Sequence, residues 1–164
     1  MKNKHIITAL VRNHSGVLTR ISGLFARRCF NIDSLAVCAT ENPELSRMTI
    51  VSDTNDGLAE QMVKQLDKLC DVIKVCELGG GRVSRELLLV KIRLTAAQRP
   101  EIESTCNIYK AKLVDLSPES VIVELSGEPN KLDALINILK PYGIIELART
   151  GVTALERGGK AINE

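Results

Sequence analysis

The feature that most constrains the fold of this 164-residue chain is an order of strand and helix patterns that occurs twice. Short apolar runs rich in β-branched residues predict strands, and apolar residues spaced three or four apart predict amphipathic helices. In each half the order is strand, helix, strand, strand, helix, strand. We therefore predict an α+β protein with two consecutive ferredoxin-like βαββαβ domains, each an antiparallel sheet with both helices on one face.

The first half shows this order clearly. The predicted strands are residues 5–11, 32–39, 45–52 and 71–78. Apolar residues at helical spacing define two helices: Val17, Leu18, Ile21, Leu24 and Phe25 in the first, and Leu58, Met62, Leu66 and Leu69 in the second.

The second half repeats the order after Gly79-Gly80-Gly81, a run too costly in chain entropy to lie inside an element. The predicted strands are residues 86–94, 112–116, 121–126 and 144–148, and the predicted helices are residues 98–108 and a segment beginning at Pro129. We expect a first domain over residues 1–78, a Gly-rich linker over 79–84, a second domain over 85–155 and a flexible tail over 156–164.

Composition and motifs argue against several functions. A net charge of +2 suggests neither a nucleic-acid nor a membrane partner, and four aromatic residues are too few for a base-stacking RNA module. Five cysteines without a CxxC pair fit free thiols in a reducing cytoplasm. Neither a metal-ligand pattern nor a catalytic motif is present, so we expect no metal, no catalytic residue and no enzymatic activity from this chain alone.

The loop Asn13-His14-Ser15-Gly16, at the first strand-to-helix junction, is the best candidate site. Ser15 can cap the helix, and Gly16 lets a ligand approach the backbone. The first N–H groups of the helix, near Val17 and Leu18, are unpaired and lie at its positive end, which suits one carboxylate.

Asn31 and Ile32 open the neighbouring strand and can receive an ammonium group. With an apolar wall from Val17 and Leu18, these groups describe an aliphatic amino acid. The alternative is an ordinary capped helix after a tight turn, and the residues alone leave both open. Small cores with spare apolar residues such as Val37 and Val51 also predict a homodimer.

Four segments carry a family resemblance: NHSGVLTRISGLFARRCFNIDSL (13–35), LSRMTIV (45–51), CELGGGRVSRELLLVKI (76–92) and ELARTGVTALERG (146–158). From residue 5 to about 157 the chain closely resembles the small, regulatory subunits of acetohydroxyacid synthase (acetolactate synthase). The resemblance implies that the first domain is an amino-acid-sensing ACT domain and that the second is the C-terminal domain of the same subunits.

The resemblance implies a non-catalytic regulator of branched-chain amino acid biosynthesis. Its partner would be the large catalytic subunit, which holds thiamine diphosphate, Mg²⁺ and FAD, while this chain holds no cofactor. The small subunit raises the activity of that partner and confers feedback inhibition by valine. The alternative is a generic ACT-domain amino-acid sensor that acts on a different enzyme.

In that family the effector site lies between two paired ACT domains. The loop that matches Asn13, His14, Ser15, Gly16, Val17 and Leu18 comes from one chain, and the strand that matches Asn31, Ile32 and Cys38 comes from the other. Family members commonly have Gly-Tyr where this chain has Cys29-Phe30. We therefore expect Cys29 to adopt a left-handed conformation at the end of the helix, at a cost of about 1 kcal/mol.

Overall fold

The computed structural model describes residues 3–159 and 161–162, and its backbone divides into two compact units. The described residues up to Val83, together with those from Val152 onward, form the first unit. Residues Ser84–Gly151 form the second.

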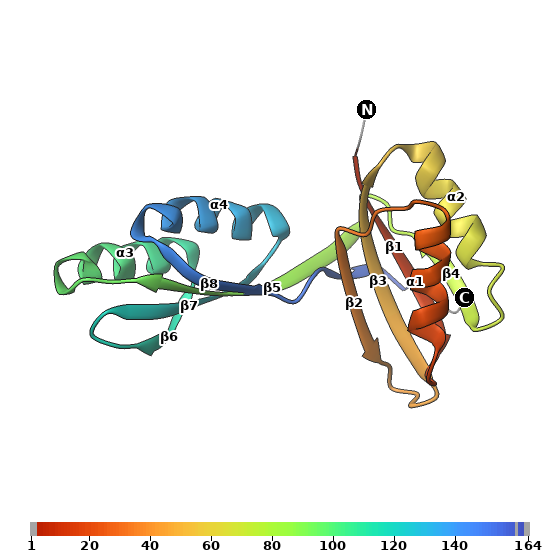
Figure 1. Ribbon diagram of the computed structural model, residues 1–164, viewed down its shortest axis with the longest axis horizontal. Helices are drawn as coiled ribbons and strands as arrows, with labels where there is room; N and C mark the ends of the chain where they lie inside the picture. The colour runs from red at the N-terminus through yellow and green to blue at the C-terminus, as the bar shows by residue number, and fades with distance from the viewer. Residues whose placement is uncertain (1–2, 160, 163–164) are drawn as a thin grey trace. The chain divides into compact units, whose positions relative to one another are not determined.

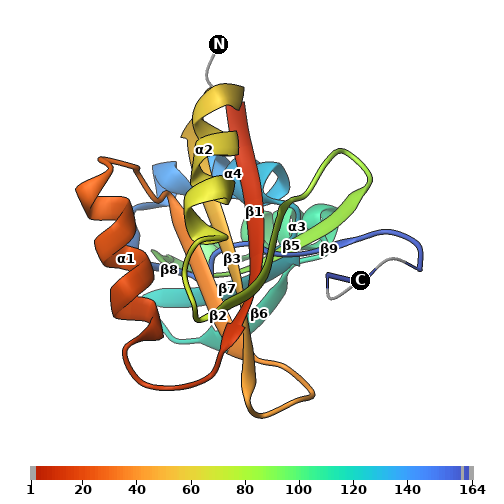
Figure 2. The same ribbon diagram turned by 90° about the vertical axis from the view of Figure 1, so that its right-hand side faces the viewer.

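The first unit is a four-stranded antiparallel sheet with two helices on one face (Figures 1 and 2). Its elements are β1 (Asn3–Arg12), α1 (Val17–Arg27), β2 (Ser34–Ala39), β3 (Leu45–Thr54), α2 (Asp56–Leu66) and β4 (Val72–Glu77). The strand order is β2-β3-β1-β4, so β2 and β4 form the edges. The predicted βαββαβ order is confirmed.

Alternation along β1 produces the two faces of this sheet, because successive side chains of a strand point to opposite sides. Ile7, Ala9 and Val11 join the core beneath the helices, where they meet Ile21 and Phe25 of α1. Ile6 belongs to a separate apolar cluster. Four of the five residues of the apolar stripe read from the sequence of α1 therefore cover the sheet, and Leu18 is exposed.

The second unit repeats the arrangement, with α3 and α4 on one face of its sheet (Figure 1). Its elements are β5 (Arg82–Arg93, which begins in the first unit), the 3-10 turn η1 (Ala96–Gln98), α3 (Arg99–Tyr109), β6 (Lys112–Leu116), β7 (Ser120–Gly127), α4 (Pro129–Leu139), the 3-10 turn η2 (Lys140–Tyr142) and β8 (Ile144–Arg149). The strand order is β6-β7-β5-β8. Both predicted helices are present, each with a proline in its first turn, where the missing N–H is not needed.

A buried ion pair fastens β8 to β5 in the second unit. Arg149 donates from Nε and Nη2 to the two carboxylate oxygens of Glu86, over 2.8 and 2.6 Å, and from Nη1 to Asp133 of α4. The hydrogen bond to Glu86 raises the pKa of Arg149 above its ordinary value. These paired hydrogen bonds from Arg149 explain why the Glu86 carboxylate can be buried near the start of the second unit.

The C-terminal residues correct the predicted domain boundary. A ninth strand, β9 (Thr153–Glu156), pairs with β5, and the Arg157 N–H donates to the Gly81 carbonyl over 2.9 Å. Residues 82–84 of the predicted linker therefore belong to β5, and residues 152–155 leave the predicted second domain for the first unit.

Burial explains the new boundary. Val152 and Ala154 pack on the helix-free face of the first sheet, against Ile6, Val51 and Leu78. Val51 is thus covered by the chain itself and is not spare apolar surface, whereas Val37 on β2 remains exposed. The predicted flexibility of residues 156–164 stays a prediction, and Lys160, Asn163 and Glu164 lie outside the described residues.

Candidate effector site

The loop between β1 and α1 is tied to the β2–β3 turn by two hydrogen bonds from Asn13. The backbone N–H of Asn13 donates to the Glu44 carbonyl over 2.7 Å, and its Nδ2 donates to the Pro43 carbonyl over 2.8 Å. One of the two N–H donors of the Asn13 side chain is therefore used within the chain, which leaves the other N–H and the amide oxygen to offer a ligand.

Gly16, and not Ser15, directly precedes helix α1, and this corrects the expected role of Ser15. Gly16 is the N-cap residue with φ of 89°, and no side chain makes a capping hydrogen bond there. The first hydrogen bond of the helix runs from the Arg20 N–H to the Gly16 carbonyl, so the N–H groups of residues 17–19 have no partner within the helix. A Cβ placed on Gly16 would meet nothing within 4 Å, so the space before these donors is open.

The buried carboxylate of Asp71 links this loop to helix α1 through His14 and Arg20. Asp71, next to β4, accepts from Arg20 Nη1 over 2.5 Å, and its other oxygen lies 3.2 Å from His14 Nε2. Burial opposes ionisation of Asp71, but the hydrogen bonds and charges of Arg20 and His14 outweigh it and hold the pKa of Asp71 below its usual range. The imidazole of His14 is thereby held in place, with Nδ1 2.9 Å from the Ser15 carbonyl.

Sequence reasoning missed Asp71 and Arg20 as parts of this site. They lie 51 residues apart, and no local pattern links them. Only the antiparallel pairing of β1 with β4, which puts the end of one beside the start of the other, brings Asp71 under the loop.

The two apolar residues of the predicted site have different environments. The Val17 side chain is buried in the core of the first unit, so only its backbone can face a ligand. Leu18, on the next position of α1, is 47% exposed. The apolar wall that was predicted from both residues therefore reduces to Leu18.

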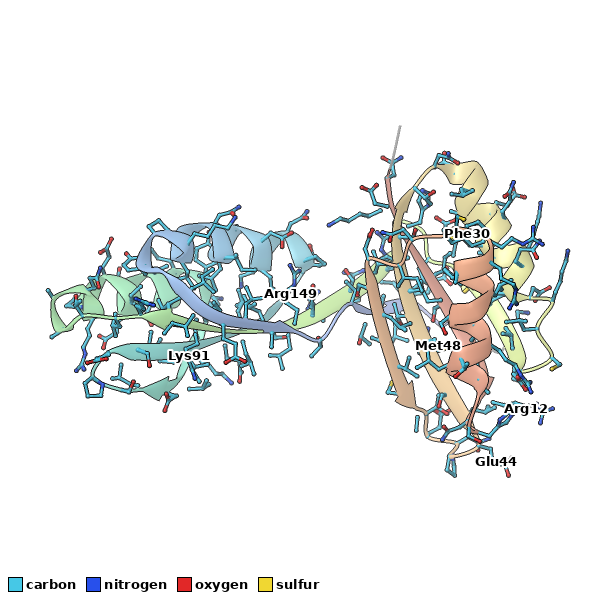
Figure 3. The ribbon with its side chains drawn as sticks, viewed as in Figure 1. Arg12, Phe30, Glu44, Met48, Lys91 and Arg149 are labelled. Atoms are coloured by element: carbon cyan, nitrogen blue, oxygen red, sulfur yellow. The ribbon has the colours of Figure 1, made fainter. Side chains whose placement is uncertain are left out.

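Asn31 and Ile32 lie at the opposite end of the same sheet from the loop. Ser34, just after them, pairs with Val51, which in turn pairs with Ile6, so these three residues form one row across the sheet. The loop directly follows Arg12, which forms another row with its partner Leu45. Six residues of β1 separate these rows, which is about 20 Å at ~3.3 Å per residue. Figure 3 shows the same separation, with Phe30 near one end and Arg12 and Glu44 at the other.

Within one chain, therefore, the predicted site residues form two groups. Asn13 to Leu18 lie together at one end. Cys38 lies near that end because it pairs with Arg47, which is two positions along β3 from Leu45, the partner of Arg12. Asn31 lies at the other end, where its Nδ2 donates to Asp33 over 2.6 Å and its carbonyl accepts from Ser52 Oγ over 2.7 Å. One small molecule cannot touch both groups of a single chain.

Neither a metal centre nor a membrane span is found in the described part of the chain. No group of three or more His, Cys, Asp or Glu side chains among residues 3–159 and 161–162 is arranged to hold a metal ion. None of the described helices is long and apolar enough to cross a membrane.

Comparison with known proteins decides the family. Residues 7–74 match the model "AHAS small subunit-like ACT domain", in which AHAS is acetohydroxyacid synthase, and residues 85–158 match the model "Small subunit of acetolactate synthase". The acetolactate synthase small subunit of Mycolicibacterium smegmatis is 49% identical, over 96% of this chain and 94% of its own length. The chain belongs to the acetolactate synthase small-subunit family.

Two further relatives agree with this membership. The acetolactate synthase small subunit of Bacillus subtilis is 46% identical, over 94% of this chain and 91% of its own. The crystal structure of the small subunit from Thermotoga maritima superimposes with a TM-score of 0.88 at 38% identity, covering 96% of this chain and 99% of the other. The first unit is accordingly an ACT domain, as the sequence predicted.

Proposed function

We propose that this chain is the regulatory subunit of an acetolactate synthase. It binds the large catalytic subunit, raises the activity of that subunit and makes the holoenzyme sensitive to valine. In this proposal thiamine diphosphate, Mg²⁺ and FAD belong to the large subunit, and this chain contributes no catalytic residue and no cofactor. Family membership supports the role of a subunit, and the geometry of the ACT domain supports the effector site.

The observation that carries the proposal is the separation of the two groups of site residues on a sheet with a free edge. Among the described strands, β2 pairs only with β3. Antiparallel pairing of β2 with β2 of a second copy, about a twofold axis, would place the start of one β2 beside the end of the other. Asn31 of one chain would then approach the Asn13–Leu18 loop of its partner, and each dimer would hold two equivalent sites.

The chemistry of the completed site suits valine. The open N–H groups at the start of α1 and the absence of a Cβ at Gly16 favour a carboxylate. The Asn31 side chain carries an amide oxygen that can accept from an ammonium group. The exposed Leu18 and the partly buried Ile32 provide the apolar walls.

The strength of binding expected from these groups is moderate. Burial of a small aliphatic side chain contributes about 1.5–3 kcal/mol, and each charged hydrogen bond contributes about 1.5–3 kcal/mol. The entropy lost by an ordered ligand offsets part of this gain. Micromolar to millimolar affinity follows, a range in which the bound fraction of the subunit changes with the concentration of the product.

Inhibition would then follow from linkage between two ligands of the same dimer. Valine that bridges two ACT domains favours one dimer geometry, and the large subunit favours another. A coupling free energy of about 1–3 kcal/mol changes the affinity of each ligand by 5- to 150-fold. No contact between valine and the catalytic centre is required.

The test uses two substitutions at Gly16 in holoenzyme reconstituted with the large subunit. Both Gly16→Ala and Gly16→Asp impose a side chain at φ of 89°, and open space accommodates either one. Only Gly16→Asp places a carboxylate where that of valine would lie. We expect both variants to activate the large subunit, and only Gly16→Asp to abolish inhibition by valine.

Two results would contradict the proposal. Inhibition that is unchanged by Gly16→Asp would remove the loop from the effector site. A purified chain that neither activates the large subunit nor copurifies with any thiamine-diphosphate enzyme would favour the alternative, a generic ACT-domain sensor of another enzyme.

A further inference from the structure

A second hollow lies on the helix-free face of the ACT domain, between the sheet and the C-terminal segment that returns to it. Its volume is about 320 Å³, at the lower end of the 300–1,000 Å³ range of small-molecule pockets. Leucine and isoleucine side chains form much of its wall: Leu10, Leu45 and Leu78 from the sheet side, and Leu155 and Ile162 from the C-terminal segment. The hollow is therefore formed only because residues from 152 onward belong to this unit.

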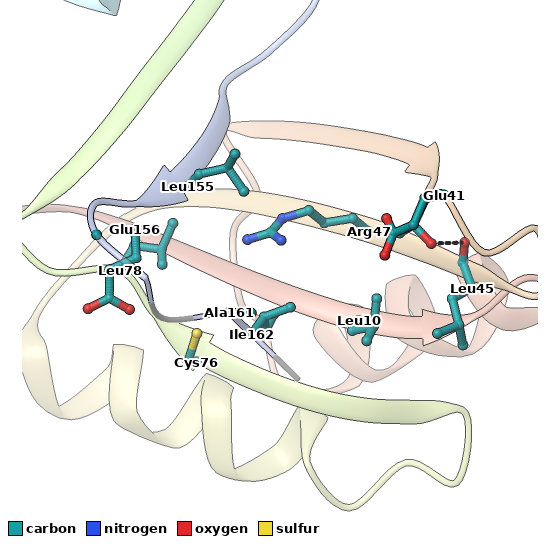
Figure 4. A pocket seen from close by; sticks show the side chains of 12 residues that line it. Leu10, Glu41, Leu45, Arg47, Cys76, Leu78, Leu155, Glu156, Ala161 and Ile162 are labelled. Atoms are coloured by element: carbon teal, nitrogen blue, oxygen red, sulfur yellow. Dashed lines mark hydrogen bonds between the residues drawn. The ribbon is translucent and has the colours of Figure 1, made fainter. Parts of the chain in front are cut away.

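Arg47 of β3 is the one cationic side chain that lines this hollow among the described residues. Figure 4 shows it reaching along the sheet, with its stem beside Glu41 and its guanidinium toward Leu155 and Leu78. Its Nε is buried and has no hydrogen-bond partner in the described part of the chain. No described carboxylate lies within 4 Å of its nitrogens, since none of the ion pairs found includes Arg47.

Thr8 supplies a second unsatisfied group on the same face. Its side chain is completely buried, and its Oγ1 has no partner among the described residues. Thr8 pairs with Thr49, two positions along β1 from the pair of Leu10 and Arg47, and it also pairs with Cys76, which lines the hollow. Buried polar groups without partners are uncommon and costly. Thr8 itself does not line the hollow, so the unpaired group that points to a missing ligand is that of Arg47.

The charges around the hollow define the class of ligand. Arg47 favours a carboxylate, but Glu41 and Glu156 also line the hollow and would repel a simple anion. Burial raises the pKa of the Cys76 thiol, so the lining has no thiolate to compete for Arg47. Among the described lining residues, one cation, two carboxylates and aliphatic walls together match a zwitterion with an aliphatic side chain.

We propose that this hollow is a second binding site, on the opposite face from the helices, for an aliphatic α-amino acid. The ligand carboxylate pairs with Arg47, the ammonium group faces the carboxylates of the rim, and the side chain lies among the leucines. Such a ligand bridges the sheet to the C-terminal segment and holds that segment against the ACT domain. This site needs one chain only, so it does not depend on the proposed dimer interface.

The experiment separates the two sites by working in the Gly16→Asp chain, where the proposed interface site is blocked. Valine, leucine and isoleucine are titrated by calorimetry, and backbone amide shifts of Leu78 and Leu155 are followed by NMR. We expect one site per chain for at least one of the three amino acids, with shifts at both residues. Arg47→Met, which keeps the length of the stem, should weaken that binding at least tenfold while the chain stays folded.

A second comparison tests the zwitterion. The 2-oxoacid that corresponds to the most tightly bound amino acid lacks the ammonium group. In the chain with native Glu41 and Glu156, this oxoacid should bind at least tenfold more weakly than the amino acid. The double variant Glu41→Gln, Glu156→Gln should remove most of that preference.

Absence of binding by all three amino acids to the Gly16→Asp chain, or binding that Arg47→Met leaves unchanged, would overturn the proposal. Equal binding of the oxoacid and the amino acid would overturn the assignment of the ligand class. None of these results depends on whether valine inhibits a holoenzyme, so the two proposals can fail separately.

Discussion

Replacement of Val152 by alanine tests whether the chain beyond Gly151 is part of the ACT domain. Val152 is 5% exposed and packs against Ile6, Val51 and Leu78. The substitution removes two buried methyl groups, a loss of about 1.6 kcal/mol at ~0.8 kcal/mol per carbon. The cavity left behind raises the loss to about 2–3 kcal/mol, because the two neighbouring strands of the sheet cannot close around it.

Hydrogen exchange resolved by residue is the appropriate assay, because the chain has two units and a single unfolding midpoint would average them. A loss of about 2–3 kcal/mol in the opening free energy accelerates exchange by about 30- to 150-fold. We expect this acceleration at amides of β1 and β3, and little change at amides of β5 and β7 beyond residue 87. Leu155→Ala is the matched control: it removes apolar atoms from β9, which directly follows Val152, but Leu155 is 54% exposed.

Val152 does not belong to the ACT domain if Val152→Ala accelerates exchange in β7 and leaves β1 and β3 unaffected. That pattern is the one expected of a second domain that extends to residue 155, as the sequence alone predicted. Equal effects of Val152→Ala and Leu155→Ala would also contradict membership of Val152 in the ACT domain, because burial of Val152 would then contribute nothing.

Two further predictions concern helix α1 and its loop. Cys29 has φ of 54°, so Cys29→Gly should relieve about 1–2 kcal/mol of left-handed strain. Part of this gain is lost because glycine has more freedom in the unfolded chain, and we expect a net stabilisation of the ACT domain by about 0.5–1 kcal/mol. The urea midpoint of unfolding should therefore rise for Cys29→Gly but not for Cys29→Ala, which keeps the strain. The pKa of Asp71 is lowered in the folded chain, so its contribution to loop order is present above its ordinary pKa of about 3.9 and is lost as pH falls through the lower folded value. Amide shifts of His14 and Gly16 should report that acid transition in the native chain and in Asp67→Asn, and a transition that persists in Asp71→Asn would assign it to another group.

The sequence by itself determined the fold of each unit, because the signals are local and periodic. The apolar stripe of α1 predicts a helix and the face that it buries, and the apolar, β-branched run of β1 predicts a buried strand. The left-handed conformation at Cys29, which the family resemblance implied from a glycine at the matching position, is confirmed.

The chemistry of the loop was also partly local. A glycine before a helix, with its open N–H groups, could be read from Asn13 to Leu18. The outcome for Ser15 and Val17 could not, because capping and burial depend on where the loop lies on the sheet. Asp71 joins His14 and Arg20 only through strand pairing between positions more than fifty residues apart.

Tertiary structure alone decided where the chain beyond Gly151 belongs. Thr153 to Glu156 has just one buried side chain, Ala154, with Val152 before it, and so short a run carries little periodic signal. Its position is set by the apolar face of a sheet formed more than seventy residues earlier, and by a backbone hydrogen bond to Gly81. Hydrophobic burial depends on the apolar area removed from water and not on the distance between residues in the sequence. The apolar residues that cover Ile6 and Val51 could therefore come from any segment able to reach them.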